Sequence, residues 1–288
     1  MADPVADPNA HGAVEQLVRF SARDGTQLCA RIGGDGPTVL MLHEFASAHL
    51  CFADFRRFFQ GFRCIELFAR GYAPSAAPDD EDGYSQAIAV DDCVDLLDAF
   101  HVEKAHLVGV SMGASTALLM ALRHPARVIS ATLMSVGGGG LPDLRPGWAA
   151  QIEKAAVRFE TDEPLAAARA FLSGPSRRGL EQRQPALFEH LVAELGSHPG
   201  RTSAAILRQI LLRRPLLTEL PDELRANQTP ILIISGAEDA HALAAGEHLL
   251  AGNVEHLVIA AAGHTPQLDQ PDHVARHTLR FLQATSSR

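Results

Sequence analysis

Short apolar runs alternate with helix-like stretches along most of this chain. Residues 38–42 and 231–234 are almost continuously apolar, which is typical of strands that are covered on both faces. Residues 86–100, by contrast, place apolar side chains at helical spacing. A chain that alternates strands and helices in this way folds into a mainly parallel sheet wrapped by helices. The sequence therefore predicts an α/β fold.

The same pattern locates the individual elements. The first two strands are separated by Asp24-Gly25, which predicts an antiparallel hairpin. We expect strands at residues 14–20, 27–32, 38–42, 64–68, 105–110, 128–134, 231–234 and 254–259, and helices at 52–59, 86–100, 112–124, 242–250 and 271–283.

One long segment interrupts the alternation. Residues 137–222 contain no convincing strand and consist of short helix-like pieces broken by prolines and glycines. Between residues 141 and 222 there are 11 Lys+Arg against 10 Asp+Glu, whereas the rest of the chain has 14 against 24. We therefore predict a mobile tail at 1–13, a core formed by 14–136 and 223–288, and a helical lid at 137–222.

Composition excludes several classes of partner. The formal net charge of −9 over 288 residues is opposite in sign to that of most nucleic-acid-binding proteins. No apolar run approaches the roughly 18 residues that a membrane helix needs, and the acidic N-terminal residues do not resemble a signal peptide. We expect a cytoplasmic protein with no nucleic acid partner and no membrane insertion. The four cysteines form no C-x-x-C pair and are expected to be free thiols. A homo-oligomer remains open.

The segment Gly109-Val110-Ser111-Met112-Gly113 carries the strongest chemical signal. It fits the pattern G-x-S-x-G, and it lies where a predicted strand ends and a predicted helix begins. A sharp strand-to-helix turn presents the serine hydroxyl, and the flanking glycines let the backbone pass close to its neighbours. The helix that begins behind the serine also directs its positive end toward a developing oxyanion.

This segment and its flanks resemble the α/β-hydrolase superfamily, over about residues 14 to 282. The resemblance implies an α/β-hydrolase fold and a triad in the chain order serine, acid, histidine. Asp239 lies three residues after Gly236, where the family usually places its acid, with the neighbouring Glu238 as the alternative. His264 lies in a loop similar to the family's histidine loop. The implied catalytic residues are thus Ser111, Asp239 and His264.

The resemblance also implies an oxyanion hole. Its two donors would be the backbone N–H groups of Met112 and Phe45. Glu44 stands where the family commonly has glycine, and a carboxylate near the oxyanion would oppose ester cleavage. We expect this side chain to turn away from the site and to pair with Arg70.

The substrate pocket is expected to involve Phe45, Met112 and Trp148, the last being the single tryptophan of the chain. Several arginines of the predicted lid could meet an anionic substrate, but a solvated helix face or ordinary ion pairs explain them more simply. These are Arg177, Arg178, Arg208, Arg213 and Arg214. No H-E-x-x-H and no strand followed by G-x-G-x-x-G is present, so we expect neither a metal nor another cofactor.

Together these features predict a serine hydrolase. It would cleave a small or medium carboxylic ester, thioester or lactone through an acyl-enzyme, with a small-molecule acyl compound as its partner. Two alternatives stay open: a C–C bond hydrolase of diketone-type substrates, which would use the same triad, and a non-catalytic binding protein on the same fold. A serine at position 111 argues against relatives that use a carboxylate nucleophile.

Overall fold

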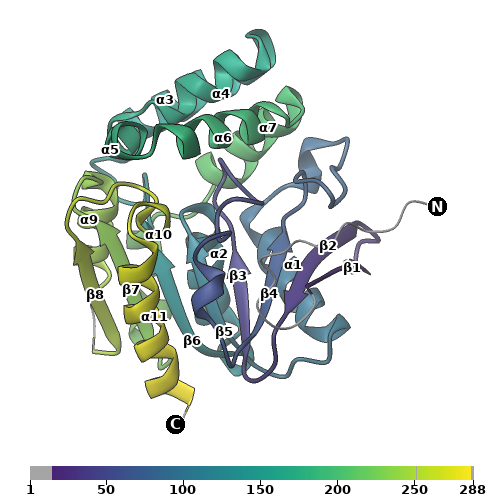
Figure 1. Cartoon of the computed structure of the whole chain (residues 1–288), viewed down its shortest axis with the longest axis vertical. Helices are drawn as coiled ribbons and strands as arrows, with labels where there is room; N and C mark the ends of the chain where they lie inside the picture. Colours follow the sequence, from purple (N-terminus) through teal and green to yellow (C-terminus); the bar gives the residue numbers. More distant parts are fainter. Residues whose placement is uncertain (1–14, 251, 287–288) are drawn as a thin grey trace.

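The chain is organised around one eight-stranded sheet, described here by a computed structural model of residues 15–250 and 252–286. The strand order is β1-β2-β4-β3-β5-β6-β7-β8, and all pairings except β1–β2 and β2–β4 are parallel (Figure 1). The strands are β1 Gln16–Ser21, β2 Gln27–Gly33, β3 Thr38–Leu42, β4 Arg63–Phe68, β5 Ala105–Val110, β6 Val128–Met134, β7 Ile231–Gly236 and β8 Val254–Ile259. The predicted α/β fold is confirmed. The predicted tail, residues 1–13, lies outside the described residues.

The hairpin at the start of the sheet follows from its turn residues. Ser21 pairs with Gln27 across β1 and β2, and Gly25 in the turn has a φ of 87°. Glycine adopts this left-handed conformation without steric cost, so the Asp24-Gly25 pair correctly predicted an antiparallel hairpin.

Helices cover both faces of the sheet. One face carries α1 (Gln86–Ala99), α2 (Met112–Arg123) and α9 (Ala240–His248), and the other carries α11 (Pro271–Ser286) together with the segment 51–62. Because β3, β5 and β7 lie between these layers, all of their residues are buried. Burial on both faces explains why these strands are apolar along their length rather than alternating.

The helix predicted at residues 52–59 is wrong. The structure has turns there, followed by a single 3₁₀ turn at Arg56–Phe58. Phe52, Phe55 and Phe59 are all buried against the sheet. A segment this short has little helical stability of its own, so the packing of its aromatic side chains decides its backbone.

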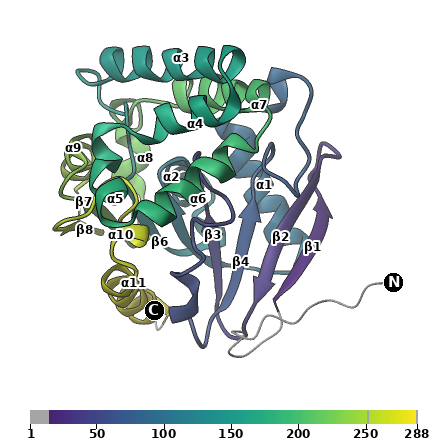
Figure 2. The same cartoon turned by 45° about the horizontal axis from the view of Figure 1, so that its top comes forward.

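The segment 137–222, called the insertion below, contributes helices between β6 and β7. They are α3 Arg145–Thr161, α4 Pro164–Leu172, α5 Arg178–Arg183, α6 Pro185–Gly196, α7 Gly200–Ile206 and α8 Pro221–Ala226. Most of them form a layer across one end of the sheet (Figures 1 and 2). A separate apolar cluster joins this layer to Phe45 and Met112 of the core. None of the helices in the described ranges is long and apolar enough to cross a membrane.

Candidate active site

Ser111 lies on a sharp turn between β5 and α2. Its φ of 51° and ψ of −103° are strained for a residue with a side chain. The flanking glycines make the turn possible: a Cβ on Gly113 would lie 2.1 Å from the carbonyl oxygen of Leu42, and one on Gly109 would lie 2.4 Å from that of Gly113. The G-x-S-x-G pattern is therefore a packing requirement that brings α2 against the end of β3.

Three predicted side chains meet at this turn. Nε2 of His264 lies 2.8 Å from Oγ of Ser111, and Nδ1 of His264 lies 2.5 Å from Oδ2 of Asp239. Asp239 is almost fully buried and also accepts a hydrogen bond from the backbone N–H of Ala242, at 3.2 Å. Burial alone would raise the pKa of Asp239, but the charge and hydrogen bond of His264 outweigh it and lower the pKa. The carboxylate therefore stays ionised beside the imidazole.

The neighbouring carboxylate has a different role. Glu238 lies 3.0 Å from Nη1 of Arg183 on α5 and remains partly exposed. It is Asp239 rather than Glu238 that contacts the imidazole, in agreement with the spacing from Gly236.

The insertion holds the loop that carries His264. The backbone N–H of His264 donates to the carbonyl of Ser176 at 2.8 Å. Asp269 accepts a hydrogen bond from the N–H of Gly263, at 2.8 Å, and pairs with Arg183, also at 2.8 Å. The position of the imidazole thus depends on residues of the insertion that the sequence did not connect with it.

Hydrogen bonds fix the orientation of the peptide group between Glu44 and Phe45, in the loop after β3. This group carries the N–H of Phe45, one of the two predicted oxyanion donors. Nε2 of His43 accepts from the N–H of Ala69 at 3.1 Å, and burial lowers the pKa of His43 to about 4, so the ring is neutral. Its Nδ1–H therefore donates to the carbonyl of Glu44, 2.7 Å away. This carbonyl and the N–H of Phe45 belong to one peptide group and point in opposite directions. The hydroxyl of Tyr72 fixes the next carbonyl, that of Phe45, at 2.8 Å.

Among residues 15–250 and 252–286, no acceptor is hydrogen-bonded to the backbone N–H of either predicted donor, Phe45 or Met112. The N–H of Gly113 donates to the carbonyl of His43 at 3.1 Å, which ties the first turn of α2 to the loop after β3.

The expected partner of Glu44 was wrong. Glu44 is fully buried and forms a two-pronged ion pair with Arg177 of the insertion. Arg70 instead pairs with Asp92 and Asp24, so it is a structural group of the core. The sequence could not reveal this exchange, because Glu44 and Arg177 are 133 positions apart. The pairing compensates the negative charge of Glu44 in the loop after β3.

A second carboxylate of the insertion binds the same loop. Oε1 of Glu194, on α6, accepts hydrogen bonds from the N–H groups of Ala48 and His49, both at 2.7 Å. Its Oε2 accepts from Oγ of Ser47 at 2.8 Å and from the N–H of Leu50 at 3.2 Å. Sequence reasoning missed Glu194, since nothing local distinguishes it from other glutamates on helices.

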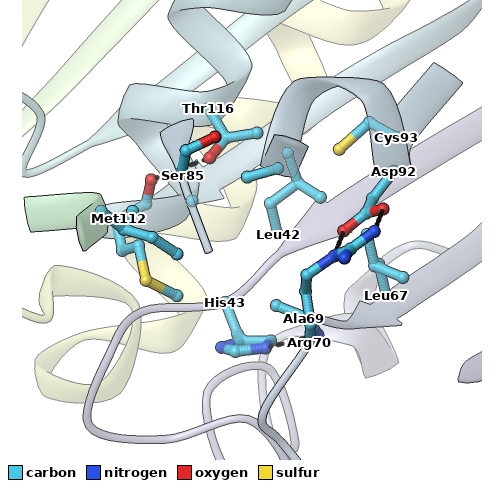
Figure 3. A pocket seen from close by; sticks show the side chains of 13 residues that line it. Leu42, His43, Leu67, Ala69, Arg70, Ser85, Asp92, Cys93, Met112 and Thr116 are labelled. Carbon is cyan, nitrogen blue, oxygen red and sulfur yellow. Dashed lines mark hydrogen bonds and ion pairs between the residues drawn. The ribbon is translucent and has the colours of Figure 1, made fainter. Parts of the chain in front are cut away.

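The three predicted substrate residues belong to or pack against the same apolar cluster, but their contacts differ. The ring of Phe45 packs edge-on against Phe159 and Phe171 of the insertion. Met112 lines a small pocket beside the loop after β3, with His43 next to it and the Arg70–Asp92 ion pair opposite (Figure 3). Neither Ser111 nor His264 lines this pocket.

Trp148, on α3, packs against the edge of this cluster and stacks on Arg214. The arginines of the insertion that we considered follow the simpler expectation in part. Arg208 forms surface ion pairs with Glu153 and Glu160, but Arg177 and Arg214 are buried rather than solvated.

The described ranges contain no cluster of three or more histidine, cysteine or acidic side chains that could hold a metal ion. His273 and His277, spaced four apart on α11, do bring their rings within 4.9 Å of each other. All four cysteines are free.

The fold and this site agree with the comparison to known families. Residues 36–277 match the model of the alpha/beta hydrolase family. The chain therefore belongs to the alpha/beta hydrolase family, as the G-x-S-x-G segment around Ser111 and its flanks had suggested.

Individual relatives share about a quarter of their residues with this chain or fewer. The chain is 26% identical over 294 residues to a 2-hydroxy-6-oxononadienedioate/2-hydroxy-6-oxononatrienedioate hydrolase of Paraburkholderia xenovorans, covering 94% of this chain and 96% of that protein. It is 24% identical to mouse epoxide hydrolase 3, covering 87% and 71%. Its fold is similar to that of an enol-lactonase from Burkholderia xenovorans, with a TM-score of 0.79, 21% identity, and coverage of 92% and 100%. The family and these relatives support a hydrolase.

Proposed function

We propose that this protein is a serine hydrolase that cleaves a small or medium carboxylic ester, thioester or lactone through an acyl-enzyme. The observation that carries the proposal is the contact of 2.8 Å between His264 Nε2 and Ser111 Oγ, with Asp239 on the other ring nitrogen. A serine hydroxyl is a weak nucleophile unless a base takes its proton, and this imidazole is placed to do so.

Each group then has one task in the reaction. Ser111 Oγ attacks the acyl carbon while His264 accepts the hydroxyl proton, and the resulting oxyanion accepts hydrogen bonds from the N–H groups of Phe45 and Met112. When the tetrahedral intermediate collapses, His264 protonates the departing alcohol. Water then attacks the acyl-serine by the same route and releases the acid. Asp239 holds the imidazole in the tautomer that carries its proton on Nδ1.

The insertion acts in this proposal as a lid that also assembles the site. Ser176 contacts the histidine loop, and Arg177 and Glu194 contact the loop that carries Phe45. The predicted limits of this lid at residues 137 and 222, and a cytoplasmic location, remain predictions. For the substrate we propose a class of compound, namely esters, thioesters and lactones, and no individual molecule.

A second activity has support from one relative. The Paraburkholderia protein, similar over nearly all of both chains, is named as a hydrolase of 2-hydroxy-6-oxo dienedioates. Hydrolysis of a C–C bond beside a carbonyl would use the same nucleophile and oxyanion donors, with a carbon leaving group protonated in place of the alcohol oxygen. The products are then a carboxylic acid and a ketone.

One experiment separates these activities. Purified wild type and Ser111→Ala are assayed on short p-nitrophenyl esters and on diketones, and the wild type is quenched in acid for intact-mass analysis. If the protein is an esterase, we expect the wild type to turn over the esters and to carry an acyl adduct on Ser111. Turnover of diketones alone would favour the C–C hydrolase. Binding of these compounds without turnover by either protein would favour a non-catalytic binding protein and overturn the proposal.

A further inference from the structure

A buried arginine beneath the insertion has no counter-charge. Arg214 is 7% exposed, and its Nη1 donates to Oγ of Ser115 at 3.0 Å. Its Nε has no hydrogen-bond partner. Within the described ranges no carboxylate forms an ion pair with Arg214. The nearby positive charge of Arg145 lowers the pKa of Arg214 further, in the same direction as burial. Burial and Arg145 lower the pKa of Arg214 to about 9, so the guanidinium is still charged at neutral pH.

Arg214 differs in this respect from two other buried arginines, which have carboxylate partners. Arg70 pairs with Asp92, and Arg177 pairs with Glu44. A buried charge is costly when it is unpaired, and proteins supply either a carboxylate or a ligand to balance it. Arg214 has no such carboxylate within the described ranges, and its guanidinium contacts only the Trp148 ring and the Ser115 hydroxyl there, so a bound anion would supply the missing counter-charge.

The surroundings of Arg214 include a small pocket. It is lined by Gln86, Ser115 and Arg214, together with leucines of α2 and glycines of the 137–140 segment. Nε of Arg214 is a buried donor without an acceptor, and Oε1 of Gln86 is a buried acceptor without a donor. The free N–H of Arg214 can therefore donate to an anion, whereas the Gln86 oxygen cannot contribute to binding one.

Trp148 and the glycines shape the outer side of this arginine. The Trp148 ring centre lies 4.7 Å from the guanidinium carbon, which fixes the plane of the guanidinium group. A Cβ on Gly139 would lie 2.2 Å from the Trp148 ring, and one on Gly138 would lie 3.3 Å from Nη2 of Arg214. The glycine run thus has a packing reason besides the flexibility that its sequence suggests.

The arginine is also close to the nucleophile along α2. Ser115 is one helical turn from Ser111, and its hydroxyl donates to the Ser111 carbonyl at 3.3 Å while it accepts from Arg214. One turn of α-helix rises about 5.4 Å. An anionic group at Arg214 would therefore lie within the reach of a small acyl compound whose other end is at Ser111.

The geometry points to Arg214, which Ser115 and Trp148 position, as a subsite for a carboxylate of the substrate, so that this enzyme acts on acyl compounds that also carry a carboxylate. The inference rests on the proposed function. A monoanion balances the single guanidinium charge, and the flat fork of arginine matches a planar carboxylate.

The single tryptophan of the chain provides a direct test, because Trp148 stacks on the arginine in question. Ser111→Ala protein is titrated with butyrate and, as the neutral isostere, with butyramide, while tryptophan fluorescence is recorded. We expect a saturable change with butyrate only. The change should disappear in Ser111→Ala/Arg214→Gln and persist in Ser111→Ala/Arg169→Gln, since Arg169 lies in an exposed ion pair on α4.

Kinetics provide a second readout, measured as the ratio of kcat/KM for a glutarate half-ester of p-nitrophenol over that for the pentanoate ester. Arg214→Gln should lower this ratio about 10-fold or more, as expected for loss of a charge-assisted hydrogen bond, and Arg169→Gln should not change it. If Arg214→Gln does not fold, Arg214→Lys is measured in the same way and should also lower the ratio, because lysine keeps the charge but not the flat fork.

The outcomes distinguish this inference from the proposed function. An equal response to butyrate and butyramide, no response to butyrate, or an unchanged ratio in the Arg214 variants would overturn the carboxylate subsite even where Ser111 forms an acyl-enzyme. Binding of butyrate through Arg214 without any acyl-Ser111 would leave the subsite in place and remove the proposed hydrolase.

Discussion

The buried carboxylate of Glu44 and the buried guanidinium of Arg177 form a two-pronged ion pair that joins the loop after β3 to the insertion. Removing one partner leaves the other charge buried and unpaired, which typically costs about 3–5 kcal/mol. Glu44→Gln and Arg177→Met should each lower the free energy of unfolding by about this amount. Their combination should cost clearly less than the sum, since it leaves no charge behind. Urea denaturation of the four proteins measures the coupling, and additive losses would show that the two groups do not depend on each other.

Glu194 should influence catalysis although it lies far from the reacting atoms in sequence. Its two oxygens accept four hydrogen bonds from residues 47–50, and Glu194→Gln replaces one of these acceptors by a donor. We expect kcat to fall about 10-fold, less than the 10² to 10³ of losing an oxyanion donor outright, with a smaller change in KM. Glu189→Gln, on the exposed side of the same helix, is the matched control. Equal kinetics in both variants would contradict a role of Glu194 in placing the loop.

The glycine two residues after Ser111 is required by packing. A Cβ at Gly113 would meet backbone atoms of Leu42, which cannot move without displacing β3. Gly113→Ala should therefore lower stability by about 1–3 kcal/mol and reduce activity. Gly147, in α3, has open space around it, so Gly147→Ala should be neutral or stabilise by up to about 1 kcal/mol. Thermal unfolding and ester turnover of both variants measure the difference between the two positions. A Gly113→Ala protein that is as stable and active as wild type would contradict the packing requirement.

Much of this arrangement could be predicted from local sequence. Ser111, Asp239 and His264 each follow a strand, and the carboxyl ends of β5, β7 and β8 meet at one edge of the parallel sheet. A triad at that edge therefore follows from strand order and from short motifs, and so does the apolar character of the central strands.

Other features have no local signal. The choice of Arg177 rather than Arg70 as the partner of Glu44 depends on where α5 and its preceding turn lie above the sheet. The burial of Arg214 depends in the same way on the packing of the insertion. At residues 52–59 the aromatic spacing is compatible with a helix, but contacts with the sheet impose turns instead.

Two buried histidines should make the fold sensitive to acid. Burial lowers the pKa of His43 and of His106 to about 4, from an ordinary value of 6.5. Between these values the unfolded chain binds protons that the folded chain does not, so stability is complete above pH 6.5 and falls as the pH decreases toward 4. Each histidine contributes a slope of about 1 kcal/mol per pH unit in this window. Unfolding free energies of wild type and His106→Gln, measured across the window, should show a shallower slope in the variant. Parallel curves would contradict the assignment.

The most direct measurement of the central claim is covalent labelling of the folded protein with a fluorophosphonate, followed by peptide mass analysis. Activation of Ser111 by His264 predicts one adduct, on Ser111, and none at that position in Ser111→Ala. In His264→Gln the labelling rate should fall by about 10³-fold or more, because the triad acts as a unit. A folded wild-type protein that remains unlabelled, or that labels at the same rate without its imidazole, would contradict the account.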